Sequence, residues 1–254
     1  MSNTTSSFQG LTALVTGASS GIGAATAVAF ASKGAHVLIH YNRQQEQAAQ
    51  VLAAVRQAGA QGELLQADLS HMDGVHALIK ALAGRRIDIL VNNSGSLIRR
   101  IPVLEFSEPL WEQVITLNLT SVFFLSQAVL PGMVERKSGV IVNISSIAAL
   151  NGGGRGALAY ATAKGAVNTM TKALAKEFAP LGIRVNGVSP GTVDTNFHRT
   201  FSTEPMLNAA RASTPMGRLG TSEEIADAIV FLSSDQARFI QGQMLEVNGG
   251  ALMP

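Results

Sequence analysis

A tyrosine and a lysine stand four residues apart in the segment Tyr160-Ala161-Thr162-Ala163-Lys164. On a helix, residues at this spacing share a face, so the phenol and the ammonium group would be neighbours. A free phenol has a pKa of about 10, and a nearby ammonium would lower that pKa towards the range in which general acid–base catalysis is efficient. By itself the pair is a weak motif, because a surface tyrosine and lysine can share a helix face by chance.

Two hydroxyl groups follow a predicted strand upstream of this pair, in the run Asn143-Ile144-Ser145-Ser146. Side chains at the carboxyl end of a parallel strand lie at the edge of the sheet where such folds bind ligands. Hydroxyls placed there can donate to a carbonyl oxygen on which charge builds during a reaction. The alternative is that these serines only end the strand.

A glycine-rich loop, Thr16–Gly23, follows the first predicted strand and opens the first predicted helix. A backbone that approaches a pyrophosphate needs residues without Cβ, and a helix N-terminus supplies free N–H groups and positive dipole. The spacing is Gly-x-x-x-Gly-x-Gly rather than the commoner Gly-x-Gly-x-x-Gly, and an ordinary glycine-containing turn is the alternative. The loop residues that we expect to bind a dinucleotide are Gly17, Ser19, Ser20, Gly21, Ile22 and Gly23.

Short β-rich runs alternate with longer helical stretches along the whole chain. The predicted strands are Leu11–Thr16, Ala35–His40, Glu63–Ala67, Ile87–Asn92, Val140–Ser145, Ile183–Val188 and Met244–Val247. The predicted helices lie near Ile22–Lys33, Gln44–Ala58, Val75–Ala83, Glu108–Leu130, Ala157–Phe178 and Ser222–Leu232. This alternation predicts a single doubly wound Rossmann-type α/β domain over residues 1–254, with a mainly parallel seven-stranded sheet. The weakly patterned residues 191–220 are expected to form a substrate lid.

The composition excludes several classes of protein. A near-balanced charge, with 19 basic and 17 acidic residues, argues against nucleic acid as the main partner. The absence of cysteine excludes disulfides and thiol chemistry, and the five histidines show no ligand-like clustering, so no metal site is expected. Met1–Gly10 lacks the pattern of a signal peptide, and no apolar run reads as a membrane span, so a cytoplasmic protein is expected.

Together these motifs resemble the short-chain dehydrogenase/reductase superfamily over nearly the whole chain. By that resemblance Thr16–Gly23 is similar to the cofactor loop, and Ser146, Tyr160 and Lys164 match the catalytic serine, tyrosine and lysine. The resemblance implies that Tyr160 exchanges the proton and that Lys164 lowers its pKa and holds the nicotinamide ribose. It assigns a proton-relay water to Asn118. Further cofactor contacts are implied for Asp68, Leu69, Asn93, Ser94, Gly95, Pro190, Gly191, Val193 and Thr195.

Two departures from the family pattern affect these assignments. Ser94 replaces the usual alanine. Ser146 stands fourteen residues before Tyr160, where thirteen is common, and the glycines at 152–154 offer room for the extra residue. The residues after Ser146 favour it as the catalytic serine, and Ser145 stays open.

The end of the second predicted strand bears on the choice of nicotinamide. There Tyr41 stands where a carboxylate would select NAD, and Arg43 is placed to meet the extra phosphate of NADP, with Asn42 between them. We therefore expect NADP(H) to be preferred, with NAD(H) possible, and Tyr41→Asp to push the enzyme towards NADH. The alternative is that Arg43 is a solvated residue at a helix start.

The substrate expected by resemblance is a small ketone or secondary alcohol. The alternative is a β-ketoacyl-carrier-protein reductase, for which Arg136 and Lys137 offer basic residues but Leu181 stands where arginine is common. A non-catalytic cofactor-binding sensor is a further alternative, against which the complete catalytic set argues. Arg99 and Arg100 could attract an acidic substrate or the cofactor phosphates, or lie in a solvated loop.

The helix expected around Leu110–Leu130 is apolar nearly all round. Such a helix needs burial on more than one side. We therefore expect a partner subunit against it, in a homotetramer of the kind common in the family. A fully internal helix is the alternative.

Overall fold

The computed structural model describes residues 7–254, so the first six residues of the predicted domain lie outside the described residues. Seven strands form one sheet in the order β3-β2-β1-β4-β5-β6-β7, and all six pairings are parallel. The strands are β1 Thr12–Val15, β2 His36–Tyr41, β3 Gly62–Gln66, β4 Ile89–Asn92, β5 Gly139–Ile144, β6 Ile183–Pro190 and β7 Met244–Val247. The predicted doubly wound fold is confirmed, and each strand end lies within two residues of its expected position.

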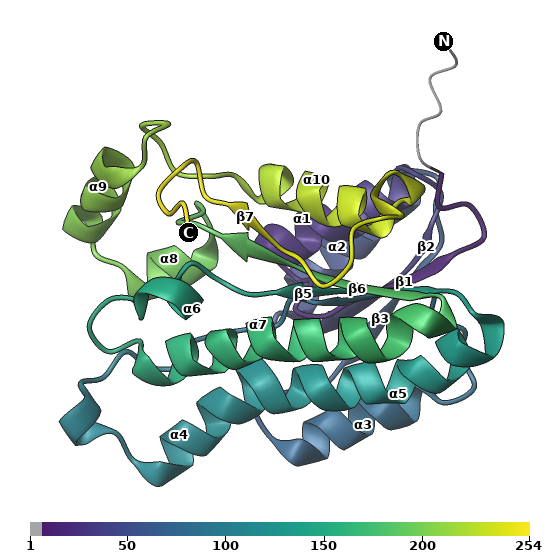
Figure 1. Ribbon diagram of the computed structural model, residues 1–254, viewed down its shortest axis with the longest axis horizontal. Helices are drawn as coiled ribbons and strands as arrows, with labels where there is room; N and C mark the ends of the chain where they lie inside the picture. The colour runs from purple at the N-terminus through teal and green to yellow at the C-terminus, as the bar shows by residue number, and fades with distance from the viewer. Residues whose placement is uncertain (1–6) are drawn as a thin grey trace.

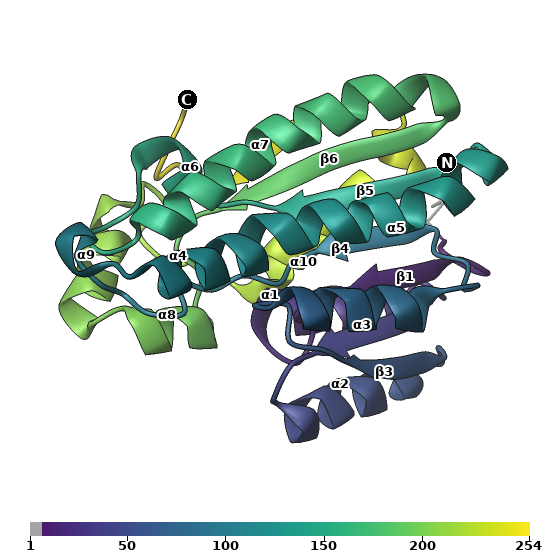
Figure 2. The same ribbon diagram turned by 90° about the horizontal axis from the view of Figure 1, so that it is seen from below.

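Helices cover both faces of the sheet (Figures 1 and 2). One layer holds α1 (Gly21–Ala31), α2 (Gln45–Gln57) and α10 (Ser222–Ser233). The other holds α3 (Met72–Leu82), α4 (Glu108–Ile115), α5 (Ser121–Arg136) and α7 (Leu158–Phe178). Two hydrophobic clusters result, one on each face of the sheet. Burial on both faces explains why the central strands read as continuous apolar runs rather than as an alternating pattern.

The helix expected over 108–130 is longer and less regular than the sequence indicated. A π-helical segment, Thr116–Thr120, joins α4 to α5, and α5 continues through Pro131 to Arg136. The last turn is held by the N–H of Lys137, which bonds to Met133 and Val134, and by Arg136, which donates to the carbonyl of Ile87.

From the sequence we expected no segment long and apolar enough to cross a membrane. By length and composition, that expectation was wrong for one helical stretch. Within residues 7–254, the helical stretch 108–136 meets that test, with a mean hydropathy of 1.6 over its best window. In the structure, 44% of that window is buried, and α5 packs beside α3, β4 and β5. A core helix satisfies the same test of composition, and packing within the domain accounts for the buried part of this one.

The weakly patterned residues 191–220 contain two helices that the sequence did not predict, α8 (Asn196–Phe201) and α9 (Glu204–Ser213). They project beyond the carboxyl ends of the strands, next to the short α6 (Ala148–Asn151) (Figures 1 and 2). A parallel bridge between Val193 and Gly220 closes the base of this segment. These short helices lack a long apolar stripe, which explains why periodicity did not reveal them.

Candidate active site

A cleft of about 610 Å³ opens at the carboxyl ends of the strands, where β1 pairs with β2 on one side and β4 on the other. This is the point at which the strand order reverses, and open α/β sheets bind ligands there. Its volume suits a small-molecule site. The sequence-predicted residues that line it are Gly17, Ser20, Gly21, Ile22, Asn42, Asn93, Ser94, Gly95, Ser145, Ser146, Tyr160, Lys164, Pro190, Gly191, Val193 and Thr195.

The glycine loop has the backbone of an anion cradle. Gly17 and Gly21 have φ values of +63° and +55°, which L residues with side chains rarely adopt. A Cβ on Gly23 would collide with the carbonyl oxygen of Gly17, so this glycine permits close packing within the loop. The N-cap residue Ser20 makes no side-chain cap, and the first turn of α1 holds no acidic residue. The first amides of the helix therefore have no side-chain anion or cap, as a bound pyrophosphate would require.

His40, on β2, fixes this loop in place. Its Nδ1 accepts from the N–H of Gly17 at 3.0 Å, and its Nε2 lies 3.1 Å from the carbonyl oxygen of Ala67. The backbone of His40 also accepts from Ala18 at 2.8 Å. Burial lowers the pKa of His40 to about 4, so the ring is neutral, with Nε2 as the donor. The sequence indicated a structural or solvated histidine, and it could not show that the contact lies under the cofactor loop.

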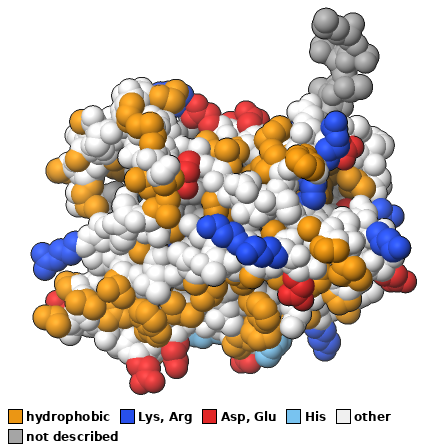
Figure 3. Space-filling view, viewed as in Figure 1, with side chains coloured by type: hydrophobic (Ala, Val, Ile, Leu, Met, Phe, Trp, Pro, Cys, Tyr) orange, Lys and Arg blue, Asp and Glu red, His pale blue; other side chains and the backbone are white. Residues whose placement is uncertain are grey.

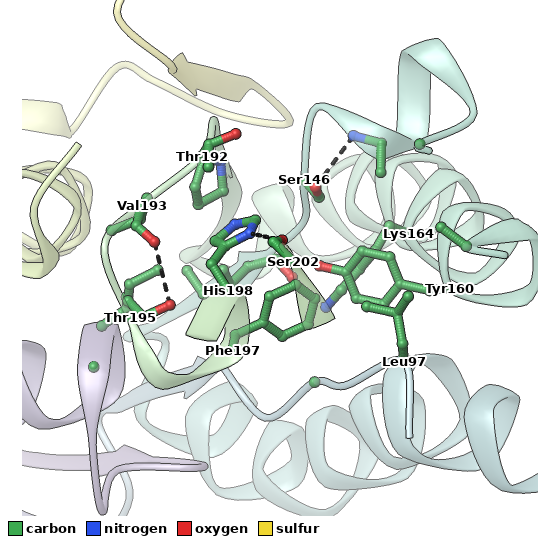
Figure 4. Close-up of a pocket in the computed structure, with 18 of the residues that line it drawn as sticks. Leu97, Ser146, Tyr160, Lys164, Thr192, Val193, Thr195, Phe197, His198 and Ser202 are labelled. Atoms are coloured by element: carbon green, nitrogen blue, oxygen red, sulfur yellow. Dashed lines mark hydrogen bonds between the residues drawn. The ribbon is translucent and has the colours of Figure 1, made fainter. Parts of the chain in front are cut away.

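Tyr160 lies on α7 and is partly buried, with Phe197 of α8 against its ring. Its ring centroid lies 5.7 Å from that of Phe197, and Figure 4 shows both rings facing the same space. Burial raises the pKa of Tyr160 to about 12, although its contact with the Ser146 hydroxyl acts in the opposite direction. The phenol is therefore protonated at neutral pH. Phe197 was not identified from the sequence, because nothing in its local pattern marks an aromatic residue that covers a tyrosine.

Lys164 lies one helical turn from Tyr160, as predicted. Its Nζ lies 5.6 Å from the Tyr160 ring centroid and donates to the carbonyl of Ile144 at 2.7 Å. The side chain is only 2% exposed, and burial lowers the pKa of its ammonium to about 8. The expectation that a charged Lys164 lowers the tyrosine pKa stays a prediction, and burial of the phenol acts in the opposite direction.

The two adjacent serines have different surroundings. Ser145 is buried, and its hydroxyl donates to Asn168 Oδ1 at 2.6 Å, with Lys164 O at 3.2 Å. Ser146 is less buried, and its hydroxyl accepts from the N–H of Ala148 at 3.1 Å and also contacts Tyr160 (Figure 4). The geometry favours Ser146 over Ser145 as the group that would contact substrate.

Asn118 lies in the π-helical segment and is completely buried. Its Nδ2 donates to the carbonyls of Ser96 and Val114, each at 2.8 Å, and its Oδ1 accepts from Ser96 N at 3.1 Å. A Cβ on Gly95 would lie 2.9 Å from Asn118 Oδ1 and 3.1 Å from Lys164 Nζ. Gly95 therefore keeps the space between the asparagine and the lysine open, where the predicted relay water would have to lie.

The end of β2 differs from the expectation at one residue. Tyr41 is only 6% exposed and does not line the cleft, whereas the neighbouring Asn42 does. Tyr41 therefore packs in the domain core rather than against a ribose, because successive side chains of a strand point to opposite faces. The Arg43 side chain is 86% exposed, with its Nη2 4.0 Å from Asp68 Oδ2.

The remaining predicted cofactor residues flank the cleft. Asp68 is partly buried, which by itself would raise its pKa, but hydrogen bonds from Ser70 and Asn42 outweigh burial and hold the pKa below its ordinary value. Leu69 is buried in the core. The hydroxyl of Ser19 donates to Gln44 Oε1 at 3.1 Å, outside the cleft lining. None of these three residues lines the cleft, and their contact with the adenosine end of a dinucleotide stays a prediction.

The basic residues singled out in the sequence separate in space. Arg136 and Lys137 precede β5 and so lie at the amino end of the sheet, away from the cleft mouth, where Arg136 Nε is 3.7 Å from Asp88 Oδ1. The expectation that they could serve a carrier protein at the mouth was wrong. Arg99 is exposed, whereas Arg100 lines the cleft. Among residues 7–254 there is no group of His, Cys, Asp or Glu that could hold a metal ion.

Comparison with known proteins agrees with this architecture. Residues 17–251 match the family model described as enoyl-(acyl carrier protein) reductase. An uncharacterized oxidoreductase of Bacillus subtilis is 42% identical over 94% of this chain and 98% of its own. The 3-oxoacyl-[acyl-carrier-protein] reductase of Escherichia coli is 40% identical, over 97% of this chain and 99% of its own.

Solved structures are equally similar. A candidate NAD(P)-dependent gluconate 5-dehydrogenase from Beutenbergia cavernae, with bound NADP, has a TM-score of 0.89 at 38% identity, over 96% of this chain and 98% of that one. A candidate 2-deoxy-D-gluconate 3-dehydrogenase from Agrobacterium tumefaciens, also with NADP, has a TM-score of 0.89 at 37% identity, over 96% and 97% of the two chains. The chain belongs to the short-chain dehydrogenase/reductase superfamily and is an oxidoreductase of that class.

Proposed function

We propose that this protein is an NADP(H)-dependent oxidoreductase that interconverts a ketone and a secondary alcohol, with Tyr160 as the general acid and base. The observation that supports this most directly is the placement of a protonated phenol in the same cleft as the glycine loop. A proton donor and an anion cradle in one cleft suit hydride chemistry on a carbonyl.

The residues present fit a nicotinamide dinucleotide. The amides at the start of α1 would hold the pyrophosphate, and Gly95, Gly191 and Thr195 line the part of the cleft that would receive the nicotinamide. Related structures hold NADP, which supports this cofactor here. When bound, the nicotinamide supplies or accepts the hydride.

The protein's own groups would handle the proton and orient the substrate. In the reducing direction, Ser146 donates a hydrogen bond to the carbonyl oxygen and fixes its position, and Tyr160 donates its proton to that oxygen as charge builds on it. Lys164 lies beneath the phenol and, while protonated, stabilises the phenolate that forms. Asn118 keeps a polar path behind Lys164 through which the phenolate regains a proton.

A β-ketoacyl-carrier-protein reductase is the second candidate. The names of several relatives favour it, among them those of Escherichia coli and of Synechocystis, the latter 41% identical. Arg136 and Lys137, the basic residues considered for carrier docking in the sequence analysis, lie away from the cleft mouth. We therefore favour a free small carbonyl compound. The homotetramer and the cytoplasmic location stay predictions.

Tyr160→Phe tests the mechanism directly. We expect kcat for ketone reduction to fall at least about a hundredfold, because the proton donor is removed, while NADPH affinity measured by fluorescence titration stays nearly unchanged. Tyr41→Phe is the matched control, since it removes the other phenol of the chain outside the cleft, and its kcat should stay normal. Near-normal turnover by the Tyr160 variant would exclude this role. Binding of NADPH by the wild type without reduction of any carbonyl would favour a non-catalytic sensor.

A further inference from the structure

The charge of the cleft is one-sided. Among its lining residues there is no Asp or Glu, and the basic ones are Arg100, Lys164 and His198. Lys164 turns its amino group towards the carbonyl of Ile144 beneath the tyrosine. Outside the Tyr160–Lys164 pair, Arg100 is therefore the positive charge in the cleft that a substrate would meet.

Arg100 is held in one position by its neighbours. Its Nε donates to the carbonyl of Phe201 at 2.9 Å, and its Nη1 donates to the carbonyl of Arg155 at 2.7 Å. Gly156, with φ +78°, makes room for the arginine stem, because a Cβ there would lie 2.8 Å from Arg100 Cγ. Both acceptors are neutral, so these contacts position the guanidinium without neutralising it.

One edge of the guanidinium is unused. Within residues 7–254, Arg100 Nη2 has no hydrogen-bond partner, and no carboxylate lies within 4.0 Å of the arginine nitrogens. Arg100 Nη2 is not among the buried polar atoms without a partner, so a ligand in the cleft can reach it. Guanidinium groups pair with carboxylate oxygens through charge-assisted hydrogen bonds.

His198, on the lid helix α8, sets the local charge. Its Nδ1 lies 3.0 Å from the Ser202 hydroxyl, and its ring faces the cleft on the same side as Phe197 (Figure 4). Burial, and after it the positive charge of Arg100, lowers the pKa of His198, although the Asp194 carboxylate acts in the opposite direction, so the imidazole is mainly neutral at pH 7. Arg100 is therefore the one positive charge among the lining residues at this end of the cleft, and Asp194 is the acidic residue that acts on His198 from outside the lining. A single cation matches a carboxylate better than the dianion of a phosphate monoester.

We propose that the substrate is an oxo acid or hydroxy acid whose carboxylate is bound by Arg100 while its carbonyl or alcohol oxygen meets Ser146 and Tyr160. This proposal rests on the proposed function and names the substrate class for the same site. Because Arg100 also bonds to the carbonyl of Phe201 at the end of α8, a bound carboxylate would be held directly beside the lid.

The test compares keto acids with their uncharged methyl esters. Initial rates of NADPH oxidation are measured with 3-oxobutanoate, 4-oxopentanoate and 5-oxohexanoate, and with each ester. For the best chain length we expect wild-type kcat/KM to be at least about tenfold higher for the acid, as a charge-assisted hydrogen bond would give. In Arg100→Gln the ratio of acid to ester should fall to near one. The ratio separates loss of charge from a disturbed lid, since a disturbed lid lowers both rates together.

Two further variants sharpen the result. Arg100→Lys keeps a positive charge and should retain part of the preference for the acid. Arg99→Gln removes the exposed neighbouring charge and should leave the ratio unchanged; an equal loss there would show a diffuse charge effect and overturn the proposal. Equal use of acids and esters by the wild type, or preference for the uncharged N-acetylcysteamine thioester of 3-oxobutanoate, would also overturn it. Reduction of none of these compounds would instead contradict the proposed function.

Discussion

Tyr160 and Lys164 illustrate how burial sets the chemistry of a residue pair. Burial disfavours the charged form of each group, so the pKa of the phenol is raised to about 12 and the pKa of the ammonium is lowered to about 8. The two pKa values, which are ordinarily close together, therefore move apart. At neutral pH the tyrosine holds its proton, which suits it to donate in the reducing direction. Alcohol oxidation needs the phenolate, so we infer that this direction is favoured by alkaline pH, up to the point at which Lys164 loses its charge.

The choice of nicotinamide is also decided by single residues. We expect wild-type kcat/KM to be higher with NADPH than with NADH, because Arg43 can donate to the ribose phosphate. Arg43→Ala should raise KM for NADPH about tenfold and leave KM for NADH nearly unchanged. Tyr41 is buried, whereas its neighbour Asn42 lines the cleft, so a carboxylate that selects NADH has to be introduced at position 42. We therefore expect Asn42→Asp to shift the preference towards NADH.

Arg56→Ala is the matched control for the arginine variant. Arg56 is exposed in the last turn of α2, at the far end of the helix that begins just after Arg43. Its removal should not alter KM for either cofactor. Higher kcat/KM with NADH than with NADPH in the wild type would show that our assignment of the β2 end is wrong.

At the scale of elements, His40 connects the ends of three neighbouring strands, β1, β2 and β3, through hydrogen bonds. It lies on β2, accepts from the loop after β1, and pairs with the residue after β3. Protonation of Nδ1 would require the ring to lose its hydrogen bond from Gly17, because an imidazolium has no acceptor nitrogen. Acid should therefore loosen the glycine loop as well as destabilise the fold.

The pH dependence of stability tests this contact. The folded-state pKa of His40, about 4, lies below the ordinary value of 6.5, so the native state binds fewer protons between these values. The free energy of unfolding should therefore fall as pH decreases from about 6.5 to about 4, by roughly 2–3 kcal/mol from this residue. Urea unfolding at about pH 7 and 4.5 measures the loss. His40→Gln cannot take up the proton and should lose correspondingly less; equal losses in both proteins would contradict the assignment.

At the scale of the whole molecule, the question is what covers the helices α4 and α5. Figure 3 shows hydrophobic side chains gathered over these helices. Trp111 and Phe123 are 38% and 41% exposed, whereas Leu117 and Phe124 pack against the core. The outer side of α4 and α5 therefore exposes apolar side chains, and it is the surface on which we expect a partner subunit to pack.

A charge on that outer side should weaken self-association. We expect Phe123→Asp to lower the particle mass measured by light scattering, because an aspartate cannot be buried against an apolar partner without large cost. Phe124→Asp is unsuitable, since it would place the charge in the core. Circular dichroism and the melting temperature show whether the variant is folded. A folded variant of unchanged mass would exclude this surface from the interface.

The sequence by itself determined the fold and most of the motif positions. Strands buried on both faces are apolar throughout, so β1, β4 and β5 were readable from local pattern, and the glycine loop and the Tyr160–Lys164 spacing are local features as well. Local periodicity carries this information because a strand or a helix repeats its environment every two or 3.6 residues.

Only the tertiary structure decided the surroundings of those residues. It showed that Tyr41 is buried while Asn42 is not, that Arg136 lies far from the cleft, and that Arg100 faces it. It also brought Phe197 over Tyr160 and His40 under Gly17. These contacts join residues far apart in the chain, and burial fixes their pKa values. No local pattern encodes either, because both depend on which distant side chains displace water from the same space.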